Sequence, residues 1–177
     1  FGGIATSSGM AAVNTVYGAM LAQVDHVVSS AAVYGPSRVV LETYYKKYGV
    51  ESTFVNTANF EEVKNAIRPE TKLLYIETPA NPTMEITDLE ACCKLAHQHG
   101  ITVAVDNTFC SPYLQRPIEM GADIVLHSLT KFINGHADIV GGVVVAKDEA
   151  LYKKLRPIMV TLGFNMDPHQ AYLVIRG

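Results

Sequence analysis

The sequence predicts an α/β fold, a three-layer α/β/α sandwich with a mostly parallel sheet. First, short β-branched runs alternate with longer amphipathic segments, which is typical of strands and helices in a parallel-sheet architecture. Second, the near-continuous apolar runs 73–76 and 103–105 indicate strands that helices cover on both faces. Third, 177 residues that are 49% hydrophobic and 18% charged can bury one substantial core, so we expect a single domain.

The first half of the chain alternates between predicted helices and strands. In chain order these are helix 9–22, strand 25–29, helix 37–48, strand 53–56, helix 60–67 and strand 72–77. Pro36 suits a first helical position, because proline has no N–H to lose there, and Gly49 suits a C-terminal cap. Asn59 suits an N-cap, because its side-chain oxygen can accept from a free backbone N–H.

The second half continues the alternation. It predicts helix 88–99, strands 102–106, 124–127 and 139–146, helix 149–158 and an apparently helical stretch at 171–175. Thr87 suits the N-cap and Gly100 the C-terminal cap of the first of these helices. The chain begins without methionine and stops at Gly177 just after the last apolar stretch, so we expect it to be a fragment of a longer protein.

Charge and hydropathy exclude two classes of partner. The net charge of −3, the pI near 6.1 and the lack of a lysine or arginine block argue against nucleic-acid binding. No apolar run approaches the roughly 20 residues that a membrane-spanning helix needs. The start of the chain also lacks the charged region of a secretory signal. We therefore expect a soluble, cytoplasmic protein without nucleic-acid or membrane partners.

The cysteines and histidines predict neither a disulfide framework nor a metal site. Two of the three cysteines, Cys92 and Cys93, are adjacent inside a predicted helix. His97 and His99 are two residues apart on the same helix and so point in different directions. A reducing compartment fits this pattern.

Small residues open the first predicted helix, where Ser8, Gly9 and Met10 follow another serine. Backbone N–H groups are free at such a helix start, and the helix dipole there favours an anion such as phosphate. The segment lacks the glycine spacing of nucleotide-binding loops. The alternative is that Ser8 is a simple N-cap without a ligand.

Asp106 stands at the carboxyl end of a buried strand, and a carboxylate there needs a strong partner because an unpaired buried charge is costly. It either caps the following turn or pairs with the protonated ring nitrogen of a cofactor.

Ser128, Thr130 and Lys131 also follow a strand, the one predicted over 124–127. The hydroxyls can donate to a phosphate, and a desolvated lysine amine, with its lowered pKa, can attack a carbonyl carbon. The alternative for Lys131 is a solvated surface lysine.

Two further loops carry candidate residues. Prolines flank Asn81 in a loop that follows the strand 72–77, so the asparagine side chain can be held toward a ligand, although an ordinary proline-rich turn explains the pattern as well. Tyr34 either stacks its flat ring on a planar cofactor or is a half-buried core aromatic.

Taken in order, these segments resemble the Cys/Met-metabolism pyridoxal-phosphate family. This family includes methionine γ-lyase, cystathionine γ-lyase, cystathionine γ-synthase and the homoserine-ester sulfhydrylases. The resemblance rests on Glu-Thr-Pro-Ala-Asn-Pro-Thr at 77–83, Asp-Asn-Thr-Phe at 106–109 with Tyr-Leu-Gln-Arg-Pro at 113–117, and Ser-Leu-Thr-Lys-Phe-Ile-Asn-Gly-His at 128–136. It covers practically the whole chain.

The resemblance implies a role for each candidate residue. Lys131 would be the Schiff-base lysine, Asp106 the partner of the pyridine nitrogen, Tyr34 the residue stacked on the ring, and Asn81 a neighbour of the ring 3-oxygen. The implied phosphate-binding residues are Ser8, Gly9, Met10, Ser128 and Thr130. No metal is implied.

The resemblance also implies an architecture. Residues 1–177 would form the pyridoxal-phosphate-binding large domain of an aspartate-aminotransferase-type fold (fold type I), with seven strands, in a homotetramer built from dimers. The family's N-terminal arm with its Tyr-x-Arg pair, and its C-terminal small domain with the arginine for the substrate carboxylate, would lie outside this chain. Methionine γ-lyases commonly carry a cysteine two residues after the stacking tyrosine, where this chain has Pro36.

The implied activity is a carbon–sulfur lyase reaction on a sulfur amino acid. In the first reading the enzyme is methionine γ-lyase-like and forms a thiol, ammonia and 2-oxobutyrate, with Lys131 as proton shuttle and Tyr34 as acid for the departing sulfur. Cystathionine γ-lyase, cystathionine γ-synthase or a homoserine-ester sulfhydrylase is the alternative within the family. A nucleotide-binding α/β domain without catalysis is the alternative of another class.

Overall fold

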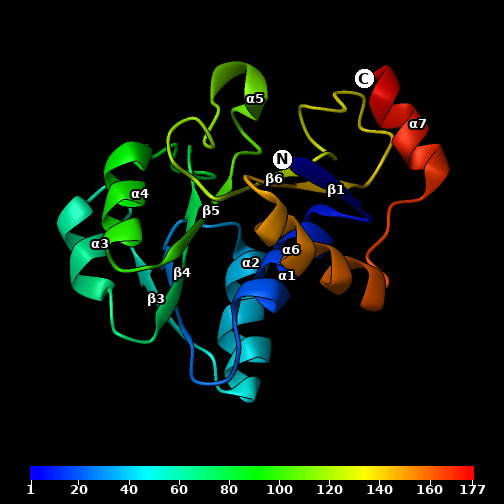
Figure 1. The fold of residues 1–177 in the computed structure, drawn as a ribbon. Helices are drawn as coiled ribbons and strands as arrows, with labels where there is room; N and C mark the ends of the chain where they lie inside the picture. Colours follow the sequence, from blue (N-terminus) through cyan, green and yellow to red (C-terminus); the bar gives the residue numbers. More distant parts are fainter.

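The computed structural model describes residues 1–177 and contains one seven-stranded sheet with the strand order β1-β7-β6-β5-β4-β2-β3 (Figure 1). The strands are β1 (Gly2–Thr6), β2 (His26–Ser30), β3 (Glu51–Val55), β4 (Thr71–Glu77), β5 (Thr102–Asp106), β6 (Ile124–Ser128) and β7 (Gly142–Ala146). Strands β2 to β6 pair in parallel, whereas β7 runs antiparallel to both β1 and β6. The predicted mostly parallel sheet is confirmed.

Helices cover both faces of this sheet. The helices of the chain are α1 (Gly9–Met20), α2 (Gly35–Val39), α3 (Phe60–Ala66), α4 (Leu89–Gln98), α5 (Ser111–Leu114), α6 (Glu149–Thr161) and α7 (Pro168–Arg176). Helices α1, α2 and α6 lie on one face, and α3 and α4 lie on the other (Figure 1). The three-layer α/β/α arrangement is therefore confirmed. No helix combines the length and the apolar character that crossing a membrane requires.

Alternate residues of the central strands pack into two separate cores. Leu73 and Tyr75 face the core beneath α1, while Leu74 and Ile76 face the core beneath α4. All four are fully buried or nearly so, and burial of each of the three aliphatic side chains among them contributes about 1.5–3 kcal/mol relative to exposure. This two-sided burial explains why the strand reads as a continuous apolar run rather than an alternating one.

Most predicted elements are found within a few residues of their expected bounds, but the helix expected over 37–48 is irregular. Helix α2 begins at Gly35, so Pro36 lies in its first turn as expected. The helix then continues through a π-helical turn, Val40–Tyr44, and a 3-10 turn, Tyr45–Tyr48. Gly49 ends it with a φ of 82°, and Gly100 has a φ of 68° after α4, in line with their predicted capping positions.

Three details of the prediction are wrong. Asp88, not Thr87, is the N-cap of α4 and accepts from the Ala91 N–H, while Thr87 is buried and hydrogen-bonded to other polar groups. The strand expected over 139–146 begins only at Gly142, because the pairing with β6 starts there. The sequence did not predict β1, whose opening glycines carry little strand propensity and which is held by β7 along its whole length.

Candidate active site

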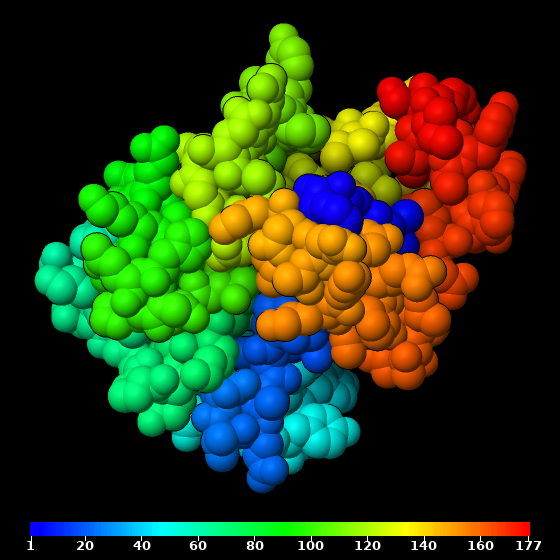
Figure 2. All heavy atoms as spheres, in the orientation of Figure 1, coloured from blue at the N-terminus to red at the C-terminus, as the bar shows by residue number.

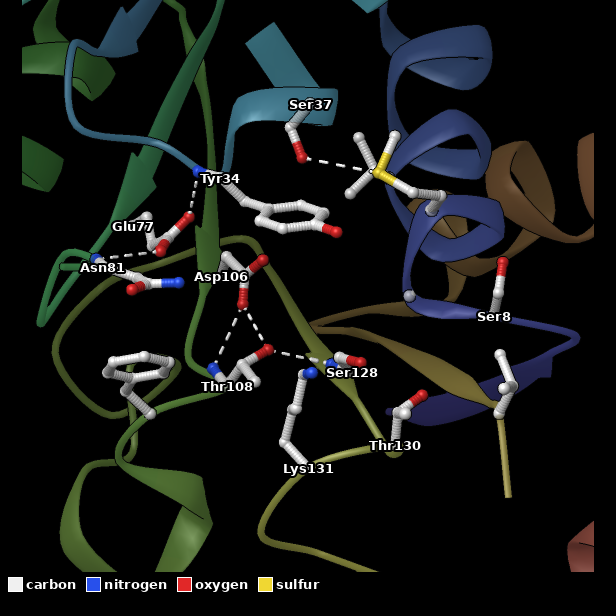
Figure 3. A pocket seen from close by; sticks show the side chains of 15 residues that line it. Ser8, Tyr34, Ser37, Glu77, Asn81, Asp106, Thr108, Ser128, Thr130 and Lys131 are labelled. Atoms are coloured by element: carbon white, nitrogen blue, oxygen red, sulfur yellow. Dashed lines mark hydrogen bonds between the residues drawn. The ribbon is translucent and has the colours of Figure 1, made fainter. Parts of the chain in front are cut away.

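An open cavity of about 280 Å³ lies at the C-terminal ends of the parallel strands (Figure 3). This is the edge at which such sheets bind ligands. Its lining comprises Ser8, Gly9, Met10, Val13, Tyr34, Ser37, Glu77, Asn81, Asp106, Thr108, Phe109, Ser128, Thr130, Lys131 and Val140. Every site residue predicted from the sequence is in this set, so the fold gathers residues from Ser8 to Lys131, 123 positions apart, around one space.

The amino end of α1 forms one end of the cavity. Ser8 is the N-cap, and its Oγ accepts from the Ala11 N–H at 3.0 Å. The N–H groups of Gly9 and Met10, in the first turn, have no partner within an α-helix. Together with the helix dipole they would favour an anion at this end, which is what the sequence predicts.

Two glycines let this helix end approach the neighbouring strands. A Cβ on Gly9 would lie 2.9 Å from the Ser128 Cβ, closer than real side chains pack. A Cβ on Gly142 would overlap the Ser8 carbonyl oxygen. The Ser8 turn and the end of β6 therefore lie side by side because both positions lack a side chain. The Thr130 hydroxyl borders the same space, but it also donates to the Gly141 oxygen at 3.3 Å and accepts from the Gly141 N–H at 3.1 Å.

Asp106, at the end of β5, provides a buried carboxylate near the middle of the cavity (Figure 3). Its Oδ1 accepts from the Thr108 N–H at 3.0 Å and from the Thr108 hydroxyl at 2.6 Å. Both bonds end on Oδ1, which leaves Oδ2 available to a ligand. Asp106 therefore caps the turn through Oδ1 and still has Oδ2 free for a ligand. The two roles that the sequence suggests for Asp106, turn cap and cofactor partner, do not exclude each other. Burial raises the pKa of Asp106, and the bonds from Thr108 oppose that rise.

Thr108 links Asp106 to the phosphate end. Its Oγ1 donates to Asp106 and accepts from the Ser128 N–H at 2.8 Å. One hydroxyl therefore fixes the distance between the carboxylate and the end of β6, which carries Ser128 into the cavity lining.

Glu77, at the end of β4, is a second buried carboxylate that lines the cavity. Its Oε2 accepts from the Tyr34 N–H at 2.7 Å, and its Oε1 accepts from the Asn81 N–H at 3.2 Å. Burial first, and then the Asp106 charge, raise the pKa of Glu77 to about 7, while the two N–H donors act in the opposite direction.

The three most exposed predicted residues lie at the cavity mouth. Tyr34 is 47% exposed and directs its ring over the cavity, so it is not a core aromatic (Figure 3). Asn81 and Lys131 are also exposed. The expected desolvation of the Lys131 amine is therefore wrong for this chain, because the loop after β6 holds the side chain at an open surface.

Sequence reasoning assigned no role to Glu77, Thr108 or Ser37. Glu77 could have been found, because it is the last residue of a buried strand, just as Asp106 is. Ser37 is buried and donates to the Met10 sulfur at 3.7 Å, a contact that no local pattern predicts.

The donor set fits pyridoxal phosphate. A helix start with free N–H groups suits the phosphate, an open carboxylate oxygen suits a protonated ring nitrogen, and a lysine amine at the mouth suits an aldehyde carbon. Glycine at position 9 keeps the phosphate end open between α1 and Ser128. Residues Ser8, Gly9, Met10, Ser128 and Thr130 would hold the phosphate.

Comparison with known proteins also indicates a pyridoxal-phosphate-dependent family. A family model described as "Cys/Met metabolism PLP-dependent enzyme" matches residues 2–177. L-methionine gamma-lyase of Porphyromonas gingivalis is 47% identical over 97% of this chain and 43% of its own length. Cystathionine gamma-lyase of Bacillus subtilis is 46% identical over 99% of this chain and 46% of its own length. The crystal structure of metB from Corynebacterium glutamicum matches with a TM-score of 0.96 and 44% identity, covering 98% of this chain and 45% of that one. The chain thus spans somewhat less than half the length of these relatives.

Proposed function

Because the chain belongs to the Cys/Met-metabolism family of pyridoxal-phosphate-dependent enzymes, we propose that its protein is a carbon–sulfur lyase acting on a sulfur amino acid. The observation that carries the proposal is the cavity, in which a helix start, a buried aspartate and a lysine meet. Membership of an enzyme family argues against the alternative of a nucleotide-binding domain without catalysis. We also propose that residues 1–177 are the cofactor-binding large domain of that enzyme.

The proposed reaction is a methionine γ-lyase-like γ-elimination that yields a thiol, ammonia and 2-oxobutyrate. The similarity to the L-methionine gamma-lyase of Porphyromonas gingivalis supports this substrate. When bound, pyridoxal phosphate supplies an electron-withdrawing ring that makes protons near the amino group easier to remove.

The residues of this chain would orient that ring and move protons. The N–H groups of Gly9 and Met10 would bind the phosphate, and Asp106 Oδ2 would accept from the ring nitrogen and keep it protonated. Tyr34 would cover the ring. Lys131 Nζ would hold the cofactor and would serve as the base that carries the proton, and the Tyr34 hydroxyl would donate a proton to the leaving sulfur.

Pro36 favours a second candidate within the family. The resemblance leads us to expect a cysteine at this position in a methionine γ-lyase, and the proline there departs from that pattern. The 46% identity with the cystathionine gamma-lyase of Bacillus subtilis supports cystathionine as the alternative substrate. Cystathionine γ-synthase and homoserine-ester sulfhydrylase activities belong to the same alternative.

Assembly and location remain predictions from the sequence: a homotetramer in the cytoplasm. Helix α5 protrudes from the surface and presents Tyr113 and Leu114, which are 89% and 72% exposed (Figure 2). We propose this protrusion as a candidate contact surface of the oligomer.

The test is to purify the whole protein and assay 2-oxobutyrate from methionine and from cystathionine side by side. We expect a yellow protein whose visible absorbance is abolished by borohydride. Faster turnover of methionine supports the first reading, and faster turnover of cystathionine supports the second. A colourless protein that binds no pyridoxal phosphate would contradict both.

A further inference from the structure

Glu77 is a buried carboxyl group for which the proposed reaction has no chemical use. It is only 6% exposed, and burying a carboxylate is costly unless its oxygens are satisfied. Both oxygens are satisfied by backbone N–H groups, Oε2 by Tyr34 and Oε1 by Asn81. Its own N–H donates to the Ser30 hydroxyl at 3.2 Å, which anchors the residue to β2 as well.

These two N–H groups belong to different loops. Tyr34 follows β2 and precedes α2, whereas Asn81 lies in the loop after β4. The loops are 47 residues apart in sequence, and both border the mouth of the cavity (Figure 3). A single side chain at the end of a central strand therefore holds two cavity-lining loops in one relative position.

We propose that Glu77 is a positioning residue that holds the Tyr34 ring and the Asn81 side chain at the spacing that the cofactor ring requires. The proposal rests on the proposed function, because it gives these two residues their roles toward the ring. Neither Tyr34 nor Asn81 is itself held by burial, since both are exposed. Their backbone bonds to Glu77 are thus the polar contacts that connect them to the sheet.

The geometry specifies a carboxylate rather than any polar side chain. A carboxylate offers two acceptor oxygens, whereas glutamine has one oxygen and an amide nitrogen that only donates. In Glu77→Gln, one of the two backbone N–H groups would face that nitrogen and lose its acceptor. In Glu77→Ala both would lose it.

Asp123 provides a matched control. It is 7% exposed, and its Oδ2 accepts from the Val103 N–H at 2.8 Å, so it too is a buried carboxylate bonded to the backbone, although its Oδ1 also pairs with Lys147 at 2.8 Å. It precedes β6, however, and does not line the cavity. Asp123→Asn should therefore cost stability without releasing either loop.

The first experiment is hydrogen–deuterium exchange on the whole protein without cofactor. At pH 8, above the Glu77 pKa of about 7, we expect the Tyr34 and Asn81 amides to exchange at least about tenfold faster in Glu77→Ala than in wild type, because a hydrogen bond to a charged group is lost at each. In Glu77→Gln one of the two should speed up, and in Asp123→Asn neither. Unchanged exchange at both amides in Glu77→Ala would overturn the proposal. Since no cofactor is present, this result does not depend on the proposed function.

The second experiment adds pyridoxal phosphate and measures its dissociation constant and its visible circular dichroism, which reports the asymmetry of the surroundings of the ring. We expect about tenfold weaker binding and a reduced dichroic band in Glu77→Ala, with Asp123→Asn near wild type. Faster amide exchange combined with wild-type binding and dichroism would overturn the proposal. A wild-type protein that does not bind pyridoxal phosphate would instead refute the proposed function, and the exchange result would still decide whether Glu77 holds the two loops.

Discussion

Glu77 and Asp106 are paired in register at the C-terminal ends of the neighbouring parallel strands β4 and β5. Two buried carboxylates thus lie on adjacent strands at the edge of one cavity, where the charge of Asp106 disfavours that of Glu77. They have different partners. Asp106 is held by Thr108 and keeps an oxygen open, whereas Glu77 is occupied at both oxygens by backbone N–H groups.

Glu77 should make the stability of the protein without cofactor depend on pH. Its pKa is about 7 in the folded protein against 4.5 for the free side chain, so between these values the folded state keeps a proton that the unfolded chain has released. The free energy of unfolding should therefore fall as pH rises through this window, by about 3 kcal/mol. In Glu77→Gln this fall should be largely removed. Denaturant unfolding at pH 5 and pH 8 checks it, and parallel profiles of the two proteins would contradict it.

Lys131→Ala should abolish nearly all turnover, because alanine provides neither the carbonyl-reactive amine nor a base. Folding should be unaffected, since the side chain is exposed and belongs to no ion pair. The measurement is the rate of 2-oxobutyrate formation together with the midpoint of thermal unfolding. Ordinary turnover in this variant would refute the role assigned to Lys131.

Asp106→Asn should lower kcat on the order of 100-fold with little loss of stability. The asparagine oxygen can still accept from the Thr108 N–H and hydroxyl, so the turn after β5 keeps its cap. A neutral amide, however, does not keep a ring nitrogen protonated. Steady-state kinetics and thermal unfolding separate the two effects. If the rate stays the same while stability drops, Asp106 is only a structural cap.

Gly9→Ala should weaken binding of pyridoxal phosphate, because the added Cβ would lie 2.9 Å from the Ser128 Cβ and push the start of α1 away from β6. Gly3→Ala is the matched control, since its Cβ would find its nearest atom at an ordinary 3.7 Å. Titration of the cofactor by its absorbance measures both variants. Equal affinity of Gly9→Ala and wild type would show that the phosphate lies elsewhere.

The sequence by itself determined most of the elements and the edge of the sheet at which the chemistry lies. Local signals are enough for this, because an apolar run such as 103–105 indicates a buried strand and a polar residue directly after it lies at the strand's end. The motifs around Asp106, Asn81 and Lys131 likewise identified the family, and the structure brings all three to one cavity.

Only the tertiary structure decided which distant residues meet. Strand β1 has weak propensity and forms because β7 pairs with it from about 140 residues away in sequence. In the sequence, Glu77 is only the first residue of a proline-rich motif. The register of β4 and β5 places it beside Asp106, and its carboxylate accepts from the Tyr34 N–H. The exposure of Lys131 likewise depends on what packs over its loop. Periodicity and capping act between residues a few positions apart, whereas register, burial and the pKa values that follow from them depend on neighbours that the chain brings together only when it folds.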